Sequence, residues 1–414
     1  MSGGATRPRA VIIGAGIGGL AAAAGLHAAG WDVTAFERAA SLEPVGAGLA
    51  MAPNGLRALD VIGAGDMVRA DAVRQEIGFR RPDGRWLVRS STDRMISGRF
   101  GDPVILLPRS RLIGALTTRV PDGVLHLSTE VTSAGPDGHV VTTAGELDAD
   151  LVVAADGINS IVRGALFPAH PGLRYAGFTT WRLLTPEVPP GREPVPMAET
   201  WGRGSVFGVM PLADGRVYCY AAAPAAQGAR SPDGELAELT RRFGGWHEPI
   251  PWLLATAAPG GVLRHDVAEL AAPLPALHGG RLALLGDAAH PMTPNLGQGA
   301  CQALEDAAVL ARLAAAVPDG SRVSAMLASY TSLRLARTAT VVRLSRRMGR
   351  AALWTSPPAV ALRDGAVLAI GKLAPAALLR GLAAVYDWRP PDPPTGGTPT
   401  GGTPTGGTPT GGTG

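Results

Sequence analysis

Hydrophobic residues recur along the chain with two different periods, and their order predicts alternating strands and helices. A continuous apolar run at residues 11–14 has the length of a buried strand, and the small apolar residues 19–30 are typical of a buried helix. We expect further strands at residues 32–36, 151–155 and 281–285, with short strands up to residue 141, and further helices at residues 54–62, 110–118, 299–315 and 322–348. Strands that alternate with helices indicate an α/β fold built around a parallel sheet.

The pattern changes between about residues 170 and 270, where short alternating runs such as residues 205–210 and 216–221 are separated by Gly, Pro and Asp. These runs predict an antiparallel sheet inserted into the α/β unit. The Rossmann-like α/β domain is then discontinuous, and the expected division assigns it residues 1–75, 105–170 and 275–345, with residues 76–104 and 171–274 in a β-rich substrate domain. An apolar stretch interrupted by charges predicts C-terminal helices within residues 346–392.

The chain ends in a Thr/Gly/Pro repeat at residues 393–414 that contains no apolar side chains. A segment that buries nothing cannot offset the entropy cost of its own ordering. We therefore expect a disordered tail that takes no part in the chemistry.

The overall composition narrows the class of protein. Hydrophobic residues make up 46% of the chain and charged residues 17%, which is typical of a globular protein. The net charge is only +4 and no run of five Lys or Arg occurs, so we expect no nucleic-acid partner. Two isolated cysteines, Cys219 and Cys301, predict neither a disulfide framework nor a metal site, and they favour a cytoplasmic location. The uncharged residues 10–29 have the length of a membrane span, but glycines interrupt them, and we expect no span.

The first candidate chemical motif is Gly14-x-Gly16-x-x-Gly19, which follows the first strand and opens the first helix. In such a motif the first glycine permits a tight turn, the second lets the backbone approach a pyrophosphate, and the third lets the helix pack on the strand. The free N–H groups of the helix N-terminus favour the phosphates. Glu37 lies 18 residues after Gly19, where an acid binds ribose hydroxyls and disfavours a 2′-phosphate. The motif therefore predicts bound FAD or NAD rather than NADP.

Two further blocks follow apolar strands. In the first, Asp156-Gly157 ends a strand and Ser160 is placed to cap a short helix. In the second, Gly286-Asp287 is followed by a Pro- and Gly-rich turn and then by a helix that begins near residues 297–300, whose positive dipole end suits a delocalised anion. We interpret His290 in this turn as a structural histidine bonded to the backbone.

These three blocks, in this order and at these separations, resemble the FAD-dependent aromatic hydroxylases, the single-component flavoprotein monooxygenases of the para-hydroxybenzoate hydroxylase fold. The resemblance covers roughly residues 8–345, and residues 292–306 look most like the branch that contains salicylate hydroxylase, urate hydroxylase and zeaxanthin epoxidase. It implies a tightly bound, non-covalent FAD, NADPH or NADH as a transient reductant, and O2 as the second substrate. The implied reaction is hydroxylation of an aromatic small molecule, phenolic or polycyclic, through a flavin C4a-hydroperoxide. The Ala-, Gly- and Arg-rich composition is typical of a high-GC bacterium and favours a role in secondary metabolism, as a monomer or a homodimer.

The resemblance also implies roles for single residues. The pyrophosphate would contact Gly14, Ala15, Gly16 and Gly19, and the adenosine half would contact Glu37, Arg38 and the backbone of Val131. The flavin half would contact Gly46, Gly48, Arg109, Asp287, Gly297, Gly299 and Ala300, and Asp156-Gly157 is the motif associated with both FAD and NAD(P)H. Pro294 would lie over the reactive face of the ring, as a candidate catalytic residue. Arg111 stands where many relatives carry an acid, and its role is open.

The β-rich insert is expected to form the substrate wall, with Trp181, Arg182, Tyr218 and Tyr220 as candidates. Tyr218 and Tyr220 alternate on one strand and should share a face. The resemblance implies that Tyr218 touches substrate, which makes it a second candidate catalytic residue beside Pro294, and the alternative is an aromatic pair that only packs in the sheet. The sequence does not single out a general base, and His247 and His265 are the two candidates.

Other classes of protein explain the motifs less well. A plain NAD(P) dehydrogenase would not need the block at Asp287, and a flavoprotein with two dinucleotide sites would need a second Gly-x-Gly-x-x-Gly. A flavin halogenase would show a Trp-x-Trp-x-Ile-Pro run, which the sequence lacks. An epoxidase or other oxidative tailoring enzyme on the same fold, and a non-oxygenating FAD-binding protein, remain open alternatives.

Overall fold

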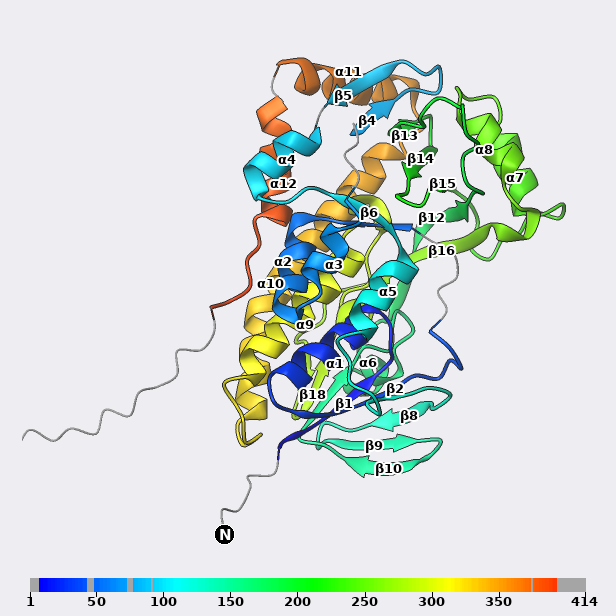
Figure 1. Ribbon diagram of the computed structural model, residues 1–414. Coiled ribbons are helices and arrows are strands. Elements are labelled where there is room, and N and C mark those ends of the chain that lie inside the picture. The colour runs from blue at the N-terminus through cyan, green and yellow to red at the C-terminus, as the bar shows by residue number, and fades with distance from the viewer. Residues whose placement is uncertain (1–6, 43–47, 73–76, 91, 374, 393–414) are drawn as a thin grey trace, which may run out of the picture.

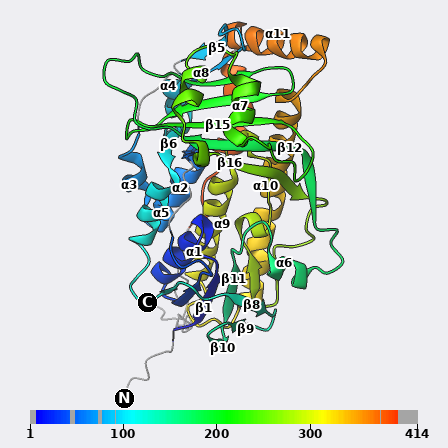
Figure 2. The same cartoon turned by 90° about the vertical axis from the view of Figure 1, so that its right-hand side faces the viewer.

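The computed structural model describes residues 7–42, 48–72, 77–90, 92–373 and 375–392. The predicted tail at residues 393–414 lies outside these ranges, as does Gly46. Figures 1 and 2 both place a large sheet at one end of the molecule and a small three-stranded sheet at the other, with the α/β unit between them.

A six-stranded sheet forms the centre of the α/β unit and confirms the predicted fold class. Its order is β17 (His278–Gly279), β18 (Leu282–Leu284), β11 (Leu151–Ala154), β1 (Arg9–Ile13), β2 (Asp32–Phe36) and β7 (Leu125–His126). All neighbours pair in parallel except β17 with β18. Because the carboxyl ends of parallel strands meet at one edge, the loops after β1, β11 and β18 come together although they are far apart in sequence.

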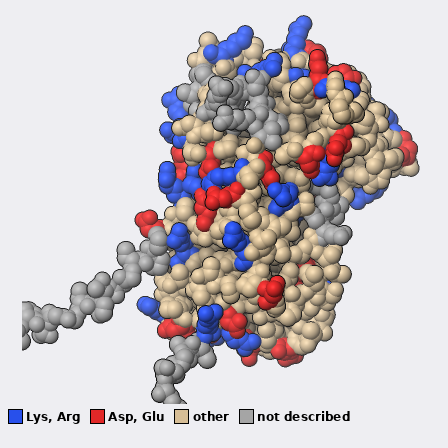
Figure 3. Space-filling model, in the orientation of Figure 1, with Lys and Arg blue, Asp and Glu red and all other residues tan. Residues whose placement is uncertain are grey.

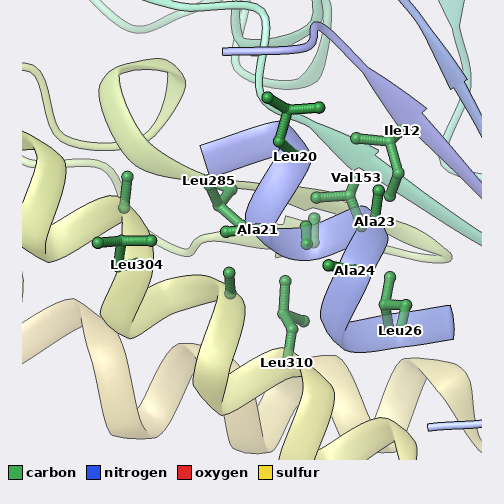
Figure 4. Close-up of a cluster of buried hydrophobic side chains, with 14 of the residues drawn as sticks. Ile12, Leu20, Ala21, Ala23, Ala24, Leu26, Val153, Leu285, Leu304 and Leu310 are labelled. Atoms are coloured by element: carbon green, nitrogen blue, oxygen red, sulfur yellow. The ribbon is translucent and has the colours of Figure 1, made fainter. Parts of the chain in front are cut away.

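The small residues of α1 (Ile17–Ala28) explain how this helix packs so closely beside α9 (Gly299–Ala314). A Cβ placed on Gly25 would lie 2.9 Å from the Ala311 methyl group, and one on Gly18 would lie 2.4 Å from the Leu285 side chain. Figure 4 shows the side chains of α1 gathered with Leu304 and Leu310 of α9. The apolar stretch at residues 10–29 is thus a strand and a helix within the protein core. Nowhere in the described ranges does a helix combine the length and the apolar character that a membrane crossing requires.

The insert builds a seven-stranded sheet from two separate parts of the chain. Its order is β16 (Leu263–Leu270), β12 (Leu173–Leu184), β15 (Val217–Pro224), β14 (Val206–Pro211), β13 (Met197–Trp201), β4 (Ile77–Arg80) and β5 (Trp86–Ser90). Every pairing is antiparallel except that of β13 with β4. The expectation of an antiparallel insert is therefore confirmed except at this one pairing.

Two helices within residues 171–274 were not expected from the strand-like pattern of that segment. They are α7 (Glu235–Phe243) and α8 (Ile250–Thr256), which cover one face of the seven-stranded sheet. In α7, Leu239 and Phe243 lie four residues apart and are both completely buried. This segment forms a helix and not a strand because the four-residue spacing places both apolar side chains on one stripe, which packs against the sheet. We call the face under α7 and α8 the outer face and the opposite one the inner face.

The remaining elements surround these layers. Strands β8 (Val131–Ala134), β9 (His139–Thr142) and β10 (Gly145–Asp148) form the small antiparallel sheet, and β3 (Gly48–Met51) pairs with β6 (Ile105–Pro108). The helices are α2 (Pro53–Ile62), α3 (Gly65–Arg69), α4 (Thr92–Phe100), α5 (Arg109–Thr117), α6 (Ile161–Leu166), α10 (Val323–Ala352), α11 (Pro357–Leu373) and α12 (Pro375–Tyr386), with 3-10 turns η1 (Pro259–Gly261), η2 (Gly286–Ala288) and η3 (Pro294–Leu296). On the face in Figure 3, basic and acidic side chains are interspersed.

Candidate active site

The glycine-rich loop between β1 and α1 has the shape that its sequence predicts. Gly14 adopts φ +94°, and a Cβ at this position would lie 2.6 Å from the carbonyl oxygen of Ala155. A Cβ on Gly19 would lie 1.8 Å from the carbonyl oxygen of Gly14, so the helix and the turn touch. At Gly16, in contrast, an added Cβ would meet nothing within 4 Å. The loop is therefore closed by Gly14 and Gly19 and is open at Gly16, where a phosphate group could approach the backbone.

Glu37 follows β2 and reaches back to this loop. Its Oε2 accepts a hydrogen bond from the Ala15 N–H at 2.8 Å, and its Oε1 accepts one from the Ala39 N–H at 2.9 Å. The contact with Ala15 was not foreseen from the sequence, and it fixes the carboxylate beside the loop. Arg38 is exposed next to it, and Val131 is buried at the start of β8.

The block after β11 presents an unpaired acceptor. Asp156 Oδ1 is buried and has no hydrogen-bond partner among the described residues, while Oδ2 receives only a long contact of 3.4 Å from the Val162 N–H. The Ser160 hydroxyl accepts from the Arg163 N–H at 2.9 Å and thus caps α6, as predicted. A buried carboxylate oxygen without a partner is costly, so this position is suited to a ligand that donates a hydrogen bond.

Arg163 ties the second block to the third, a contact that the sequence analysis missed. Its guanidinium donates to the carbonyl oxygen of Ala288 at 3.0 Å and to that of Ile158 at 2.7 Å. Arg163 is buried although it lies on a surface helix. An arginine three residues after a capping serine, beside an Asp-Gly turn, was the available signal.

The third block, the turn that begins at Gly286-Asp287, is held in place by a residue of α9. Asp306 Oδ2 accepts from the Gly286 N–H at 2.9 Å and lies 2.6 Å from Nε2 of His290. His290 is therefore structural, as expected, but its partner is this buried carboxylate and not the backbone. Gly286 has φ +62°, so the turn that presents Asp287 needs a residue that tolerates the left-handed region.

Asp287 lies where several positive charges meet. The residue has accessible surface, yet protein atoms surround it so closely that desolvation raises the pKa of its carboxyl group. The charges of His290, Arg109, Arg182 and Arg163 act in the opposite direction. Segments from four parts of the chain thus converge on one carboxylate.

The two arginines of α5 differ in their surroundings. Desolvation lowers the pKa of Arg109, and within the described ranges its side chain forms no hydrogen bond or ion pair. Arg111 instead pairs with Asp71 at 2.8 Å on the surface. Arg109, and not Arg111, is therefore placed where its charge acts on Asp287.

The helix α9 begins beside this carboxylate with its first turn free of acids and of side-chain caps. Pro294 and Gly297 are exposed in the preceding turn, and Gly299 and Ala300 are half-buried in the first turn of the helix. The Nε2 of Gln298 is buried without a partner in the described part of the chain. The free N–H groups of a sixteen-residue helix give this end a positive potential.

The inner face of the seven-stranded sheet closes the site from the other side. Tyr218 is 7% exposed and packs on Leu106, and a Cβ on Gly48 would lie 2.7 Å from its ring. The ring centroids of Tyr218 and Tyr220 are 6.1 Å apart, so the two side chains share a face as predicted. Desolvation raises the pKa of Tyr218 to about 12, although Arg182 opposes this shift.

Trp181 does not join these residues, because it lies on the outer face. Its ring is 2% exposed in the cluster beneath α7, and its Nε1 donates to Glu235 at 2.7 Å. Consecutive strand residues point to opposite faces, so Trp181 and Arg182 could not both line the site.

The two histidines named as possible bases are placed differently. His247 bonds Thr200 at 2.9 Å, and Thr200 alternates with the inner-face residues of β13. His265 is exposed on β16, and after desolvation the charge of Arg182 is the next cause that lowers its pKa. Of these two histidines, only His265 is placed where the charge of Arg182 acts on it.

The sequence and the fold both resemble those of known FAD-binding proteins. Residues 8–345 match the FAD binding domain family. The chain is 38% identical over 362 residues to an aurachin C monooxygenase/isomerase of Stigmatella aurantiaca, which covers 86% of this chain and 92% of that protein. It is 36% identical to a 3-amino-4-hydroxybenzoate 2-monooxygenase of Streptomyces cremeus, over 82% of this chain and 86% of the relative. The crystal structure of Klebsiella pneumoniae HpxO with FAD and uric acid superposes with a TM-score of 0.82 at 27% identity, over 92% of this chain and 97% of that one.

Proposed function

Since this chain belongs to the FAD-dependent aromatic hydroxylase family, we propose that it uses NAD(P)H and O2 to hydroxylate an aromatic small molecule that binds against the inner face of the seven-stranded sheet. The observation that carries this proposal is that the charges of Arg109 and of Arg182 on the inner face of that sheet both act on Asp287, which follows β18 and precedes α9. The convergence supports a site that holds a large cofactor on one side and an electron-rich ring on the other.

The residues around the three blocks fit FAD. Gly16 leaves space for the pyrophosphate, and Glu37 stands beside the loop with carboxylate lone pairs for ribose hydroxyls. Asp156 Oδ1 lacks a hydrogen-bond donor and Gln298 Nε2 lacks an acceptor among the described residues, and both needs suit a polar cofactor. We assign Asp287 to the ribityl hydroxyl groups, and Arg109 and Gly48 to the flavin half.

Bound FAD would supply the redox chemistry, in which two electrons from NAD(P)H and one oxygen atom of O2 serve the substrate while the other oxygen atom leaves as water. The chain's own task is electrostatic. The first turn of α9 has free N–H groups and no acidic residue, so it would stabilise negative charge on a cofactor bound at this helix end. Pro294 and the inner face of the sheet would exclude water from the reacting ring.

The relatives suggest which rings to test first. Two of the proteins compared above act on or bind 3-amino-4-hydroxybenzoate and uric acid, which are small, polar and rich in exchangeable hydrogens. Arg182 forms no hydrogen bond or ion pair with a described residue, so it is available to an anionic or strongly polar substrate edge. We therefore propose an aromatic substrate that carries at least one hydroxyl or ring N–H group.

The test is a substrate panel assayed with the purified yellow holoenzyme. Phenols, aminohydroxybenzoates, urate and quinolones are scored for stimulated NADPH and NADH oxidation, for hydrogen peroxide, and for a product that gains one atom of ¹⁸O from ¹⁸O2. We expect coupled oxidation with at least one ring class. Peroxide release without product across the whole panel would contradict a hydroxylase, an epoxide from an alkene would favour the epoxidase, and a flavoprotein that never oxidises NAD(P)H would favour a binding role.

A further inference from the structure

One row of side chains crosses the inner face of the seven-stranded sheet and ends in a carboxylate. Glu199 of β13 pairs with Gly208 of β14, Gly208 pairs with Tyr220 of β15, and Tyr220 pairs with Arg182 of β12. Residues that are paired directly across strands lie on the same face of a sheet. Glu199 therefore faces the same side as Arg182, whose charge acts on Asp287.

Tyr220 reaches across one strand to touch this carboxylate. Its hydroxyl donates a hydrogen bond to Oε2 of Glu199, and Gly208 lies beneath the ring. A Cβ on Gly208 would lie 2.0 Å from Cζ of Tyr220, so only glycine lets the ring span from β15 to β13. The contact therefore depends on three residues, Glu199, Gly208 and Tyr220.

The second oxygen of Glu199 is held by Trp201, whose Nε1 donates to Oε1. No Arg or Lys in the described ranges pairs with Glu199, so both of its bonds come from neutral donors. Desolvation raises the pKa of Glu199, and it raises the pKa of Tyr220 well above its ordinary value. The carboxylate therefore has an increased affinity for a proton, while Tyr220 stays neutral at any physiological pH.

The other titratable groups around Glu199 do not remove its increased affinity for a proton. Tyr218 is the next inner-face residue of β15, and Arg182 lies beyond Tyr220 on β12. Strand β4 contributes only Phe79 at the paired position, and from α11 Arg363 lies over the ring of Trp201 but is paired with Asp364 at 2.9 Å. Glu199 keeps partly accessible surface.

We propose that Tyr220 and Glu199 form the proton acceptor of the site, with Tyr220 in contact with the substrate and Glu199 acting through it. The substrate O–H or N–H bond breaks, its proton goes to Oη of Tyr220, and the phenolic proton of Tyr220 goes to Oε2 of Glu199. The electron pair stays on the substrate, whose negative charge faces Arg182. Charge is conserved, because Glu199 becomes neutral as the substrate becomes an anion.

This assignment rests on the proposed function and sharpens its substrate class. A ring activated in this way carries a hydroxyl or ring N–H that is weakly acidic at neutral pH, and its ionisation makes the ring richer in electrons for oxygen transfer. A substrate that is already ionised in solution would not need the pair. Varying the acidity of the substrate therefore tests whether Tyr220 and Glu199 accept its proton.

The experiment compares wild-type holoenzyme with Glu199→Gln and Tyr220→Phe on phenols of graded acidity, from phenol to 4-nitrophenol. Both changes keep the shape of the side chain, and Glu187→Gln, an exposed acid of the same domain, is the control. For weakly acidic rings we expect kcat/KM to fall by roughly 10²-fold in both variants, with activity partly recovered at high pH. For rings that are ionised at the assay pH, the expected change is less than about 3-fold, because no proton remains to be removed.

An equal loss with neutral and ionised rings would overturn the proposal in favour of a purely structural role, and unchanged activity in both variants would overturn it as well. The FAD content and the melting temperature of each variant are measured alongside, so that misfolding is recognised. If Glu199→Gln does not fold, Tyr220→Phe carries the same comparison.

A binding measurement separates this proposal from the proposed function, because it needs no turnover. The absorbance of bound 4-nitrophenol reports whether the probe is ionised. In wild type we expect the absorbance of the anion to appear on binding without release of a proton to the solvent, because Glu199 keeps the proton, whereas in Glu199→Gln each probe that ionises should release one proton, which a pH indicator dye counts. Binding in the neutral form only, or no binding at millimolar concentration, would refute the proton acceptor even if hydroxylation of another ring were found.

Discussion

Arg334 donates a hydrogen bond from Nε to Oδ1 of Asp306 at 2.6 Å, and neither side chain has any exposed surface. The same guanidinium also bonds Glu305, another completely buried acid. Since Asp306 positions Gly286 and His290, this ion pair supports the turn that presents Asp287.

The first prediction concerns the removal of this arginine. Arg334→Met leaves two buried carboxylates with reduced compensation, which should lower the free energy of unfolding by roughly 3–5 kcal/mol. The matched control is Arg343→Met on the same helix, because Arg343 is exposed and bonds only Thr340 in the described structure. Thermal unfolding of both holoproteins checks this, and equal melting temperatures would show that the buried network adds little.

The pH dependence of that variant follows from the sign of the shifts. Burial alone would raise the pKa of Asp306, but His290 and Arg334 lower it below its usual value. A lowered carboxyl pKa stabilises the fold above the unfolded value of about 3.9, and this contribution is lost as the pH falls through the folded pKa. Without Arg334 the acids hold protons more readily, so the difference in melting temperature should shrink from pH 8 to pH 5. A constant or growing difference would contradict this account.

The next prediction separates two glycines of one loop. Gly16→Val meets open space and should leave the unliganded fold stable, while it raises the Kd for FAD at least ~10-fold by blocking the pyrophosphate. Gly19→Ala forces a methyl group onto the carbonyl oxygen of Gly14 and should destabilise the fold by roughly 1–3 kcal/mol with or without FAD. Titration with FAD and thermal unfolding distinguish the two, and the same pattern in both variants would refute the separation of roles.

Much of this site was predictable because its motifs are local. A glycine triplet after an apolar strand restricts backbone conformation within six residues, and parallel pairing then brings Asp156 and Asp287 to the same edge. The strand and helix positions of the α/β unit followed from the same local periods, to within a few residues.

What escaped prediction depends on tertiary contacts. The outer-face position of Trp181 is decided by the strand register, which a one-residue shift would reverse. The partner of His290 is Asp306, which lies in the helix α9. Glu199 could be recognised as part of the site only from the structure, where the ring of Tyr220 crosses Gly208 to reach it. The signal for Glu199 was present, since it is an acid flanked by Met197 and Trp201 in an apolar strand, but nothing in that strand identifies its partner on the far side of β14.

Tyr218 should act as a neutral hydrogen-bond donor or packing surface and not as a base. Burial is the main reason why its pKa rises to about 12, so it keeps its proton throughout the usual assay range. Tyr218→Phe should therefore raise KM, by up to roughly 10-fold if its hydroxyl binds substrate, and should leave the pH profile between 6 and 10 unchanged. Tyr175→Phe, which removes a hydroxyl bonded to Ala225 in the same sheet, is the control. A profile that changes with Tyr218 would make it a proton carrier.

Asp287 offers the most direct test of cofactor binding. In the structure its carboxyl group has no hydrogen-bonded partner among the described side chains, so Asp287→Ala should cost the unliganded fold little. FAD affinity should fall by roughly 10- to 150-fold, because a charge-assisted hydrogen bond to the ribityl chain is lost. Asp319→Ala, on an exposed turn, serves as the control. The measurements are the flavin-to-protein absorbance ratio after gel filtration and the melting temperature of the apoprotein. Full flavin occupancy in Asp287→Ala would mean that the third block does not hold the cofactor, whereas loss of flavin together with collapse of the apoprotein would assign Asp287 to folding.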